Sequence, residues 1–335
     1  KGKLYRDEAN RLVRSYATLQ LGRIGTQKDV QVLQRILTSR KGSDANIQRS
    51  AAIGLGTLGK LISSTERVGV ANGLMEAIQK KKMKDSSAIN FSYISLAYLV
   101  NEDIAARKTD VVDNTKVIQF LLTEAESGKY MTRPFAALAL AVMGREIGEE
   151  ADVKVYGDLR QSSLEVLRNG LTSKKLDKRG RAAFACALGI IRDQKSARAL
   201  EEIVSDRKED HELRGYAALA LGLAGYAPKT AKAAIRSALK ERRSEEMRQQ
   251  CATALGLLKD TEALDILLEE LKNATSQSVK GQVVLAMAKI GTEDSVDPLV
   301  ALLKDESGRE QDLTRALACA GLGVIGDLEL IPSLA

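Results

Sequence analysis

Along most of the chain, apolar residues recur every three or four positions, the spacing that places them on one face of an α-helix. In the segment from Thr261 to Leu271, for example, Leu264, Leu267, Leu268 and Leu271 follow this spacing. The pattern predicts amphipathic helices at Asp29 to Ser39, Val111 to Glu124, Ser196 to Ser205, Thr230 to Glu241, Thr261 to Leu271 and Ser295 to Leu303. Each has one buried face and one face in water.

A second kind of segment follows each of these helices. After its first turn it is almost wholly small or apolar, as in Arg214-Gly-Tyr-Ala-Ala-Leu-Ala-Leu-Gly222. Such a helix must be covered on several sides. A single helical hairpin cannot provide that cover, but hairpins stacked on both sides can.

The second segments share a repeated motif: a basic residue, two of any kind, two small, one of any kind, one small, Leu and Gly. If the last position is taken as an anchor, copies fall at Gly22, Gly56, Ala97, Ala141, Gly189, Gly222, Gly256, Ala288 and Gly323. Most intervals lie near 34 residues, enough for two helices and two turns, and the three intervals of 41, 44 and 48 predict longer helices or loops between residues 60 and 180.

Composition supports the same class of fold. Aromatic residues make up 4% of the chain, Trp is absent, and apolar residues make up 44%. This balance suits closely packed helices better than sheets. Cys186, Cys251 and Cys319 lie in Ala/Leu-rich runs, and we interpret them as small core residues and not as a disulfide framework.

The motif resembles the HEAT-repeat family, including the bacterial HEAT-like repeats often grouped with phycobilin lyases. The resemblance covers essentially the whole chain and implies an all-α, right-handed α-solenoid (superhelix) of about nine HEAT-type hairpins. It also implies that the second helix of each repeat lines the concave side. We therefore expect residues 1–335 to form a single continuous solenoid. The last residues, Asp327 to Ala335, look like the start of another first helix, so we expect a fragment of a longer protein.

Charge is unevenly distributed and suggests partners. The net charge is +7; residues 1–100 carry 17 Lys/Arg against 7 Asp/Glu, whereas residues 251–335 carry 7 against 14. Such a molecule is expected to attract an acidic protein or peptide and to allow head-to-tail self-association. No apolar run is long enough to span a membrane. The first five residues contain no signal-peptide core, which favours the cytoplasm, although a start without Met is compatible with export after signal cleavage.

Two glycine-rich segments match a dinucleotide-binding pattern, Gly54-Leu-Gly56-Thr-Leu-Gly59 and Gly321-Leu-Gly323-Val-Ile-Gly326. In a dinucleotide site such glycines follow a strand and open a helix. Here they close a predicted helix: the anchor glycine permits close helix packing, and the glycine three residues later suits a left-handed cap. We therefore predict no cofactor.

Two rows of residues recur on the second helices. The position eight residues before the anchor is basic in seven repeats, at Arg14, Arg133, Arg181, Arg214, Arg248, Lys280 and Arg315. The row is either a structural ladder, with nearby acids such as Asp210, Glu245 and Asp312 as partners, or an exposed anion-binding stripe. Six residues before the anchor, Tyr16, Phe91, Phe135 and Tyr216 form an aromatic row. This row either binds a peptide or single-stranded nucleic acid, or packs against the next repeat.

Basic clusters in the predicted turns are candidate phosphate contacts: Lys80, Lys81, Lys82, Lys174, Lys175, Arg242 and Arg243. Solvated turns also carry such charge for no functional reason.

The sequence provides little for catalysis. Its one histidine, His211, precedes Glu212, whereas HEAT-type hydroxylases hold two irons with several His-Glu pairs. No nucleophile elbow occurs. We predict no metal site and no catalytic residues, and a non-catalytic scaffold or adaptor that binds a partner protein or peptide. The alternative is a binder of nucleic acid or another phosphate-bearing ligand that uses basic residues before position 250. An accessory or lyase-like enzyme subunit is the third alternative.

Overall fold

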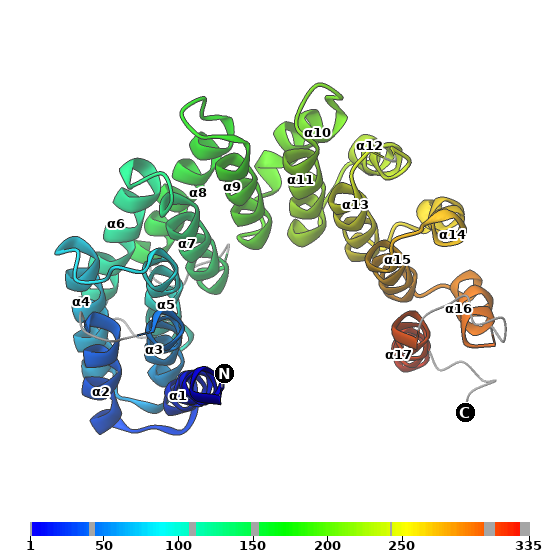
Figure 1. Cartoon of the computed structure of the whole chain (residues 1–335). Helices are drawn as coiled ribbons and strands as arrows, with labels where there is room; N and C mark the ends of the chain where they lie inside the picture. The colour runs from blue at the N-terminus through cyan, green and yellow to red at the C-terminus, as the bar shows by residue number, and fades with distance from the viewer. Residues whose placement is uncertain are drawn as a thin grey trace. The chain divides into compact units, whose positions relative to one another are not determined.

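The computed structural model describes residues 2–39, 44–106, 112–148, 154–241, 243–304 and 312–328. In these ranges it contains 17 α-helices and four short 3₁₀ helices. The chain divides into two compact units, Lys1–Ser173 and Lys174–Ala335. Within each unit the helices form two layers, odd-numbered helices in one and even-numbered helices in the other (Figure 1). The prediction of an all-α stack of helical hairpins is confirmed. A single solenoid over the whole chain stays a prediction.

The odd-numbered helices are the predicted second helices, and every anchor lies in one of them. In the first unit they are α1 (Gly2–Ile24), α3 (Ala45–Leu58), α5 (Ser86–Ala105) and α7 (Arg133–Ile147). In the second unit they are α9 (Lys178–Ile190), α11 (His211–Ala224), α13 (Glu245–Leu257), α15 (Gln277–Ile290) and α17 (Asp312–Leu328).

The even-numbered helices are the predicted first helices. They are α2 (Gln27–Thr38), α4 (Ser64–Gln79), α6 (Val112–Ser127), α8 (Lys154–Thr172), α10 (Ala197–Ser205), α12 (Lys229–Leu239), α14 (Leu264–Asn273) and α16 (Val296–Leu303). The 3₁₀ helices are η1 (Gly59–Leu61), η2 (Gln194–Ser196), η3 (Thr261–Ala263) and η4 (Glu293–Ser295). The six predicted ranges match these helices to within a few residues, counting η2 and η3 as the opening turns of α10 and α14.

Five of the second helices, α3, α5, α9, α11 and α13, begin at side-chain caps. Asp177 accepts a hydrogen bond from the Gly180 backbone N–H at 2.7 Å, and Asp210 accepts one from Glu212 at 3.0 Å. A capping carboxylate satisfies a backbone donor that has no partner inside the helix, and it interacts favourably with the helix dipole. The caps therefore help to fix where these second helices start.

The anchor glycines allow neighbouring second helices to approach closely. A Cβ on Gly256 would lie 2.7 Å from the Cα of Ala286, which is two residues before the next anchor. The same relation joins Gly189 to Ala220 and Gly222 to Ala254. The predicted role of the anchor in close packing is thus confirmed at these positions and at Gly56, where a Cβ would lie 2.9 Å from the Cα of Ser95, since a side chain there would push the two helices apart. At Gly323 the prediction is wrong, because no atom lies within 4 Å of an added Cβ.

The left-handed caps predicted at Gly59 and Gly326 do not form, although two other glycines in the corresponding position adopt this conformation. Gly225 and Gly291, three residues after their anchors, have φ of 70° and 69°. At Gly59 the prediction is wrong, because φ is −49° and the chain continues into η1. The glycine is needed there for space: a Cβ would lie 2.9 Å from Leu99 Cδ2. Gly326 also lies inside a helix, α17, whose bounds extend past it.

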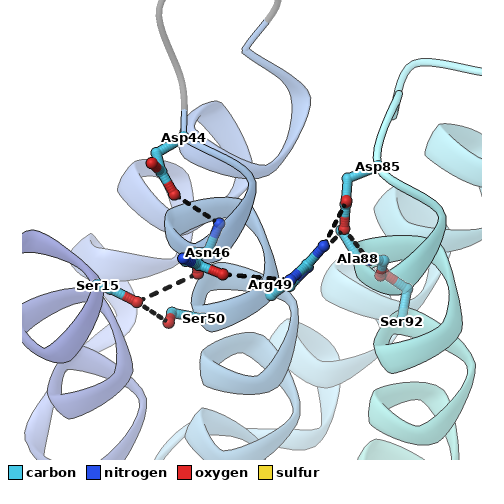
Figure 2. Close-up of polar contacts among 8 residues, drawn as sticks. All are labelled: Ser15, Asp44, Asn46, Arg49, Ser50, Asp85, Ala88 and Ser92. Carbon is cyan, nitrogen blue, oxygen red and sulfur yellow. Dashed lines mark hydrogen bonds and ion pairs between the residues drawn. The ribbon is translucent and has the colours of Figure 1, made fainter. Parts of the chain in front are cut away.

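Polar contacts join the middle of α1 to the amino-terminal half of α3, and α3 to the start of α5 (Figure 2). The Ser15 and Ser50 hydroxyls lie 2.7 Å apart. Arg49 donates two hydrogen bonds of 3.0 Å to Asp85, and Asp85 also caps the Ala88 N–H at 2.8 Å. The hydrogen bond from Arg49 holds the pKa of Asp85 below its usual value. A bidentate pair of this geometry fixes the register of α3 against α5.

Candidate protein-binding face

The basic row is partly buried, with Arg214 as its most buried member. The Arg214 side chain is 2% exposed. Its Nε donates to the carbonyl of Val204 at 2.9 Å, and its two terminal nitrogens donate to the Glu241 carboxylate at 2.8 and 2.9 Å. That hydrogen bonding holds the pKa of Glu241 below its usual value. The ladder alternative therefore describes Arg214, whose guanidinium group does not reach the surface.

Arg248 and Arg181 make corresponding pairs. Arg248 is buried and pairs with Glu270, and Arg181 is half-buried and pairs with Glu209 at 2.9 Å. In all three cases the acid belongs to the next repeat. The expectation that Asp210 would be the partner of Arg214 is wrong, because Asp210 caps α11 and pairs with Lys178.

The remaining members of the row differ from one another. Arg14 is exposed and its Nε donates to the Asn10 carbonyl at 3.3 Å. Arg133 donates to the Ala125 carbonyl at 3.0 Å, and Arg315 donates to the Leu303 carbonyl at 3.2 Å with Asp312 4.0 Å away. Arg133 and Arg315 thus tie the start of a second helix to the end of its own first helix.

The aromatic row lies where each second helix meets the previous one. Tyr16 is 60% exposed, whereas Phe91, Phe135 and Tyr216 are half-buried. Partial burial raises the pKa of Tyr216. Phe91, Phe135 and Tyr216 are therefore partly covered by packing, whereas Tyr16 is largely accessible.

The row belongs to a wider face that sequence reasoning missed. The aromatic row lies six residues before the anchor. The residues three before and one after each anchor are therefore three and seven residues further along, which places them on the same side of the helix. They also lie on roughly the opposite side of the helix from the residue just before the anchor, which is fully buried in α3, α5, α7, α9, α11, α13 and α15. We call the side formed by positions six before, three before and one after the anchor the open face of the second helices.

The open face is mainly apolar although it is incompletely covered. In the first unit it comprises Tyr16, Leu19, Arg23, Ser50, Ile53, Thr57, Phe91, Ile94, Tyr98, Phe135, Leu138 and Val142. In the second unit it comprises Ala183, Cys186, Ile190, Tyr216, Leu219, Leu223, Gln250, Thr253, Leu257, Gln282, Leu285, Lys289, Leu317, Ala320 and Val324. Apart from Ser50, which is 9% exposed, these side chains are half-buried or exposed. The sequence could have indicated this face, because Leu, Ile or Val recurs beside the small residues of the motif.

The predicted basic turns are mostly at the surface. Lys80 and Lys82 pair with Glu76 at 2.8 and 2.9 Å, so part of that cluster's charge is neutralised. Lys81, Lys174, Lys175 and Arg243 are exposed, and Arg242 lies outside the described residues. Whether these turns or the open face bind a ligand stays a prediction.

The described residues contain no group of three His, Cys, Asp or Glu side chains placed to hold a metal ion. His211 is half-buried at the start of α11. Burial raises the pKa of the Cys186 and Cys251 thiols to about 12, which suppresses the reactive thiolate. None of the helices that the structure describes is long and apolar enough to cross a membrane.

Residues 205–277 and 264–335 match the model of the HEAT-repeat family. Residues 205–335 therefore carry HEAT repeats, in agreement with the paired helices of this part of the chain. Escherichia coli YibA is similar in structure, with a TM-score of 0.51, 16% identity, and coverage of 88% of this chain and 92% of YibA. This likeness supports the fold alone.

Two further structures are less similar. A mutant of Kap121p has a TM-score of 0.47 and 12% identity over 88% of this chain and 33% of Kap121p. Human deoxyhypusine hydroxylase in complex with glycerol has a TM-score of 0.36 and 16% identity, covering 92% of this chain and 99% of that enzyme. At these TM-scores neither likeness carries a functional conclusion. A search of curated proteins finds no significant match.

Proposed function

We propose that the chain is a non-catalytic module that binds a partner protein or peptide through the open face of its second helices. The observation that carries this proposal is the apolar character of a face that the fold leaves accessible. Leu, Ile, Val, Phe and Tyr side chains occupy corresponding positions on successive helices, and neighbouring helices cover them only in part. Accessible apolar surface of this kind is typical of protein interaction sites.

The basic row supports binding only indirectly. Arg214 and Arg248 are buried in ion pairs, so they hold adjacent repeats together and keep the open-face residues at fixed spacing. A rigid array of apolar side chains loses little conformational entropy on binding, which favours affinity.

The test is an affinity capture from native lysate with the whole chain, at low and high salt, with and without nuclease. A defined protein that is retained at high salt after nuclease treatment is expected. Recovery of only nuclease-sensitive, salt-labile material would contradict the proposal and favour nucleic acid, because phosphate binding weakens steeply with the logarithm of salt concentration.

A variant with Tyr16→Ala, Phe135→Ala and Tyr216→Ala tests the surface itself. Capture is expected to be lost while helicity by circular dichroism is retained. The matched control changes apolar residues exposed on first helices, Val32→Ala and Val155→Ala, which are 42% and 41% exposed. Unchanged capture by the triple variant, together with reduced stability, would show that the aromatic row serves packing alone.

A further inference from the structure

The open face is most apolar where α5 and α7 lie side by side. Phe91, Ile94 and Tyr98 project from α5, and Met131, Phe135, Leu138 and Val142 come from α7 and the turn before it; we call these seven residues the α5–α7 patch. Tyr98 is 47% exposed and Met131 is 63% exposed, and the other members are half-buried. The Asn101 side-chain amide approaches the Val142 carbonyl at 3.5 Å, which ties the two helices together at this face.

The amino-terminal end of the patch carries excess positive charge. Lys84 and Lys129 are exposed just before α5 and α7, respectively. Asp85, next to Lys84, is occupied by Arg49 in the bidentate pair, and Glu126 is exposed three residues before Lys129. The positive ends of the two helix dipoles add to the same field. At the other end Arg145 lies beside Glu146, so the charge there is mixed.

The partial burial of the apolar residues favours a peptide over a membrane surface as the ligand. Phe91, Ile94, Phe135 and Leu138 are half-buried between helices, so a ligand must reach them with its own side chains. A peptide segment does this, whereas a flat bilayer surface does not. Aromatic and Met side chains in such settings are typical centres of protein interfaces.

We propose that the α5–α7 patch binds an amphipathic peptide segment whose apolar side chains enter the patch and whose acidic residues lie over the amino-terminal ends of α5 and α7. This inference rests on the proposed function and specifies the partner's chemistry. The contact at Tyr98 and Met131 supplies affinity, and Lys84 and Lys129 fix the direction in which the segment lies, because the opposite direction removes the acids from the cations.

The probe is a random-peptide display library selected on the whole chain, followed by affinity measurement of individual synthetic peptides. Selected sequences are expected to combine helically spaced apolar residues with an acidic end. Tyr98→Ala with Met131→Ala is expected to weaken them at least about tenfold, as loss of interface centres does. Lys84→Glu with Lys129→Glu is expected to weaken acidic peptides and strengthen versions with Lys in place of the acids.

Matched controls are Val32→Ala with Val155→Ala for the apolar pair, and Lys28→Glu with Lys154→Glu for the charged pair; all four residues lie at the surface of first helices. These controls are expected to leave affinity unchanged. Vesicles of anionic phospholipid are tested in parallel and are expected not to bind.

Three outcomes would overturn this inference. If selected peptides are insensitive to Tyr98 and Met131 but lost on changing Tyr216 and Leu223, the proposed function stands and only the location is wrong. If binding is confined to anionic vesicles, the occupant is a membrane surface. If no peptide exceeds background, the chain has no peptide site, and the capture experiment then decides whether a folded protein binds instead.

Discussion

Replacing Arg214 with Ala tests the interpretation of the basic row as a structural ladder. The substitution removes three hydrogen bonds, one to Val204 and two to Glu241. Breaking a buried ion pair by removing one partner costs about 3–5 kcal/mol, because the other charge is left without compensation. Glu241 is 16% exposed and Arg207 lies 3.5 Å from it, so we expect the low end, about 3 kcal/mol.

The assay is urea unfolding followed by circular dichroism, with Arg198→Ala as the matched control. Arg198 is 91% exposed and pairs with Glu202 at 3.1 Å, so its loss is expected to cost less than about 0.5 kcal/mol. A cost of about 1 kcal/mol or less for Arg214→Ala would refute the ladder, since it would mean that the guanidinium group is well solvated in the native state.

The pH dependence gives an independent check. Because Arg214 holds the pKa of Glu241 below its usual value of 4.5, the pair stabilises the native state fully above the unfolded pKa. That contribution is lost as the pH falls through the lowered folded pKa. The difference in unfolding free energy between the native sequence and Arg214→Ala is therefore expected to be constant near neutrality and to shrink in acid. A difference that persists unchanged at low pH would contradict the assignment.

Three further predictions concern local structure. Arg192→Gly and Lys259→Gly should each stabilise the fold by about 0.5–1 kcal/mol in urea unfolding. The reason is that φ values of 60° and 46° at these positions are unfavourable for residues with a side chain. Destabilisation would show that the Arg192 and Lys259 side chains make compensating contacts. In the same assay Gly256→Ala should cost about 1–3 kcal/mol through helix displacement, whereas Gly323→Ala, with no atom near its added Cβ, should be neutral or stabilising. The Cys251 thiol should react with a thiol reagent at about pH 8 only after unfolding, since its pKa is raised to about 12.

The repeat architecture was predictable because one motif recurs with nearly constant spacing. The anchor at Gly256 and the helices on either side follow from that motif and from apolar periodicity. The left-handed cap at Gly59 was predicted wrongly because the segment that ends at Gly59 resembles the segment that ends at Gly225. Only the structure shows that Leu99 lies beside Gly59, where it leaves little room for a Cβ.

The partners of the basic row could not be predicted from one repeat alone. Asp210 is close to Arg214 in sequence, but the helix start uses it as a cap. Glu241 lies 27 residues later and becomes the partner only when the next repeat stacks. The open face was hidden for a similar reason: Leu219 looks like a core residue until the neighbouring helices show which sides are covered.

Hydroxyl-radical footprinting of the chain, free and bound to the captured partner, tests the central claim most directly. We expect oxidation of Tyr98 on the open face and of Met131 in the turn before α7 to fall on binding, and oxidation of Val32 on a first helix to stay unchanged. Protection confined to first helices or to the basic turns, with Tyr98 and Met131 oxidised as in the free chain, would contradict the claim that the open face is the binding surface.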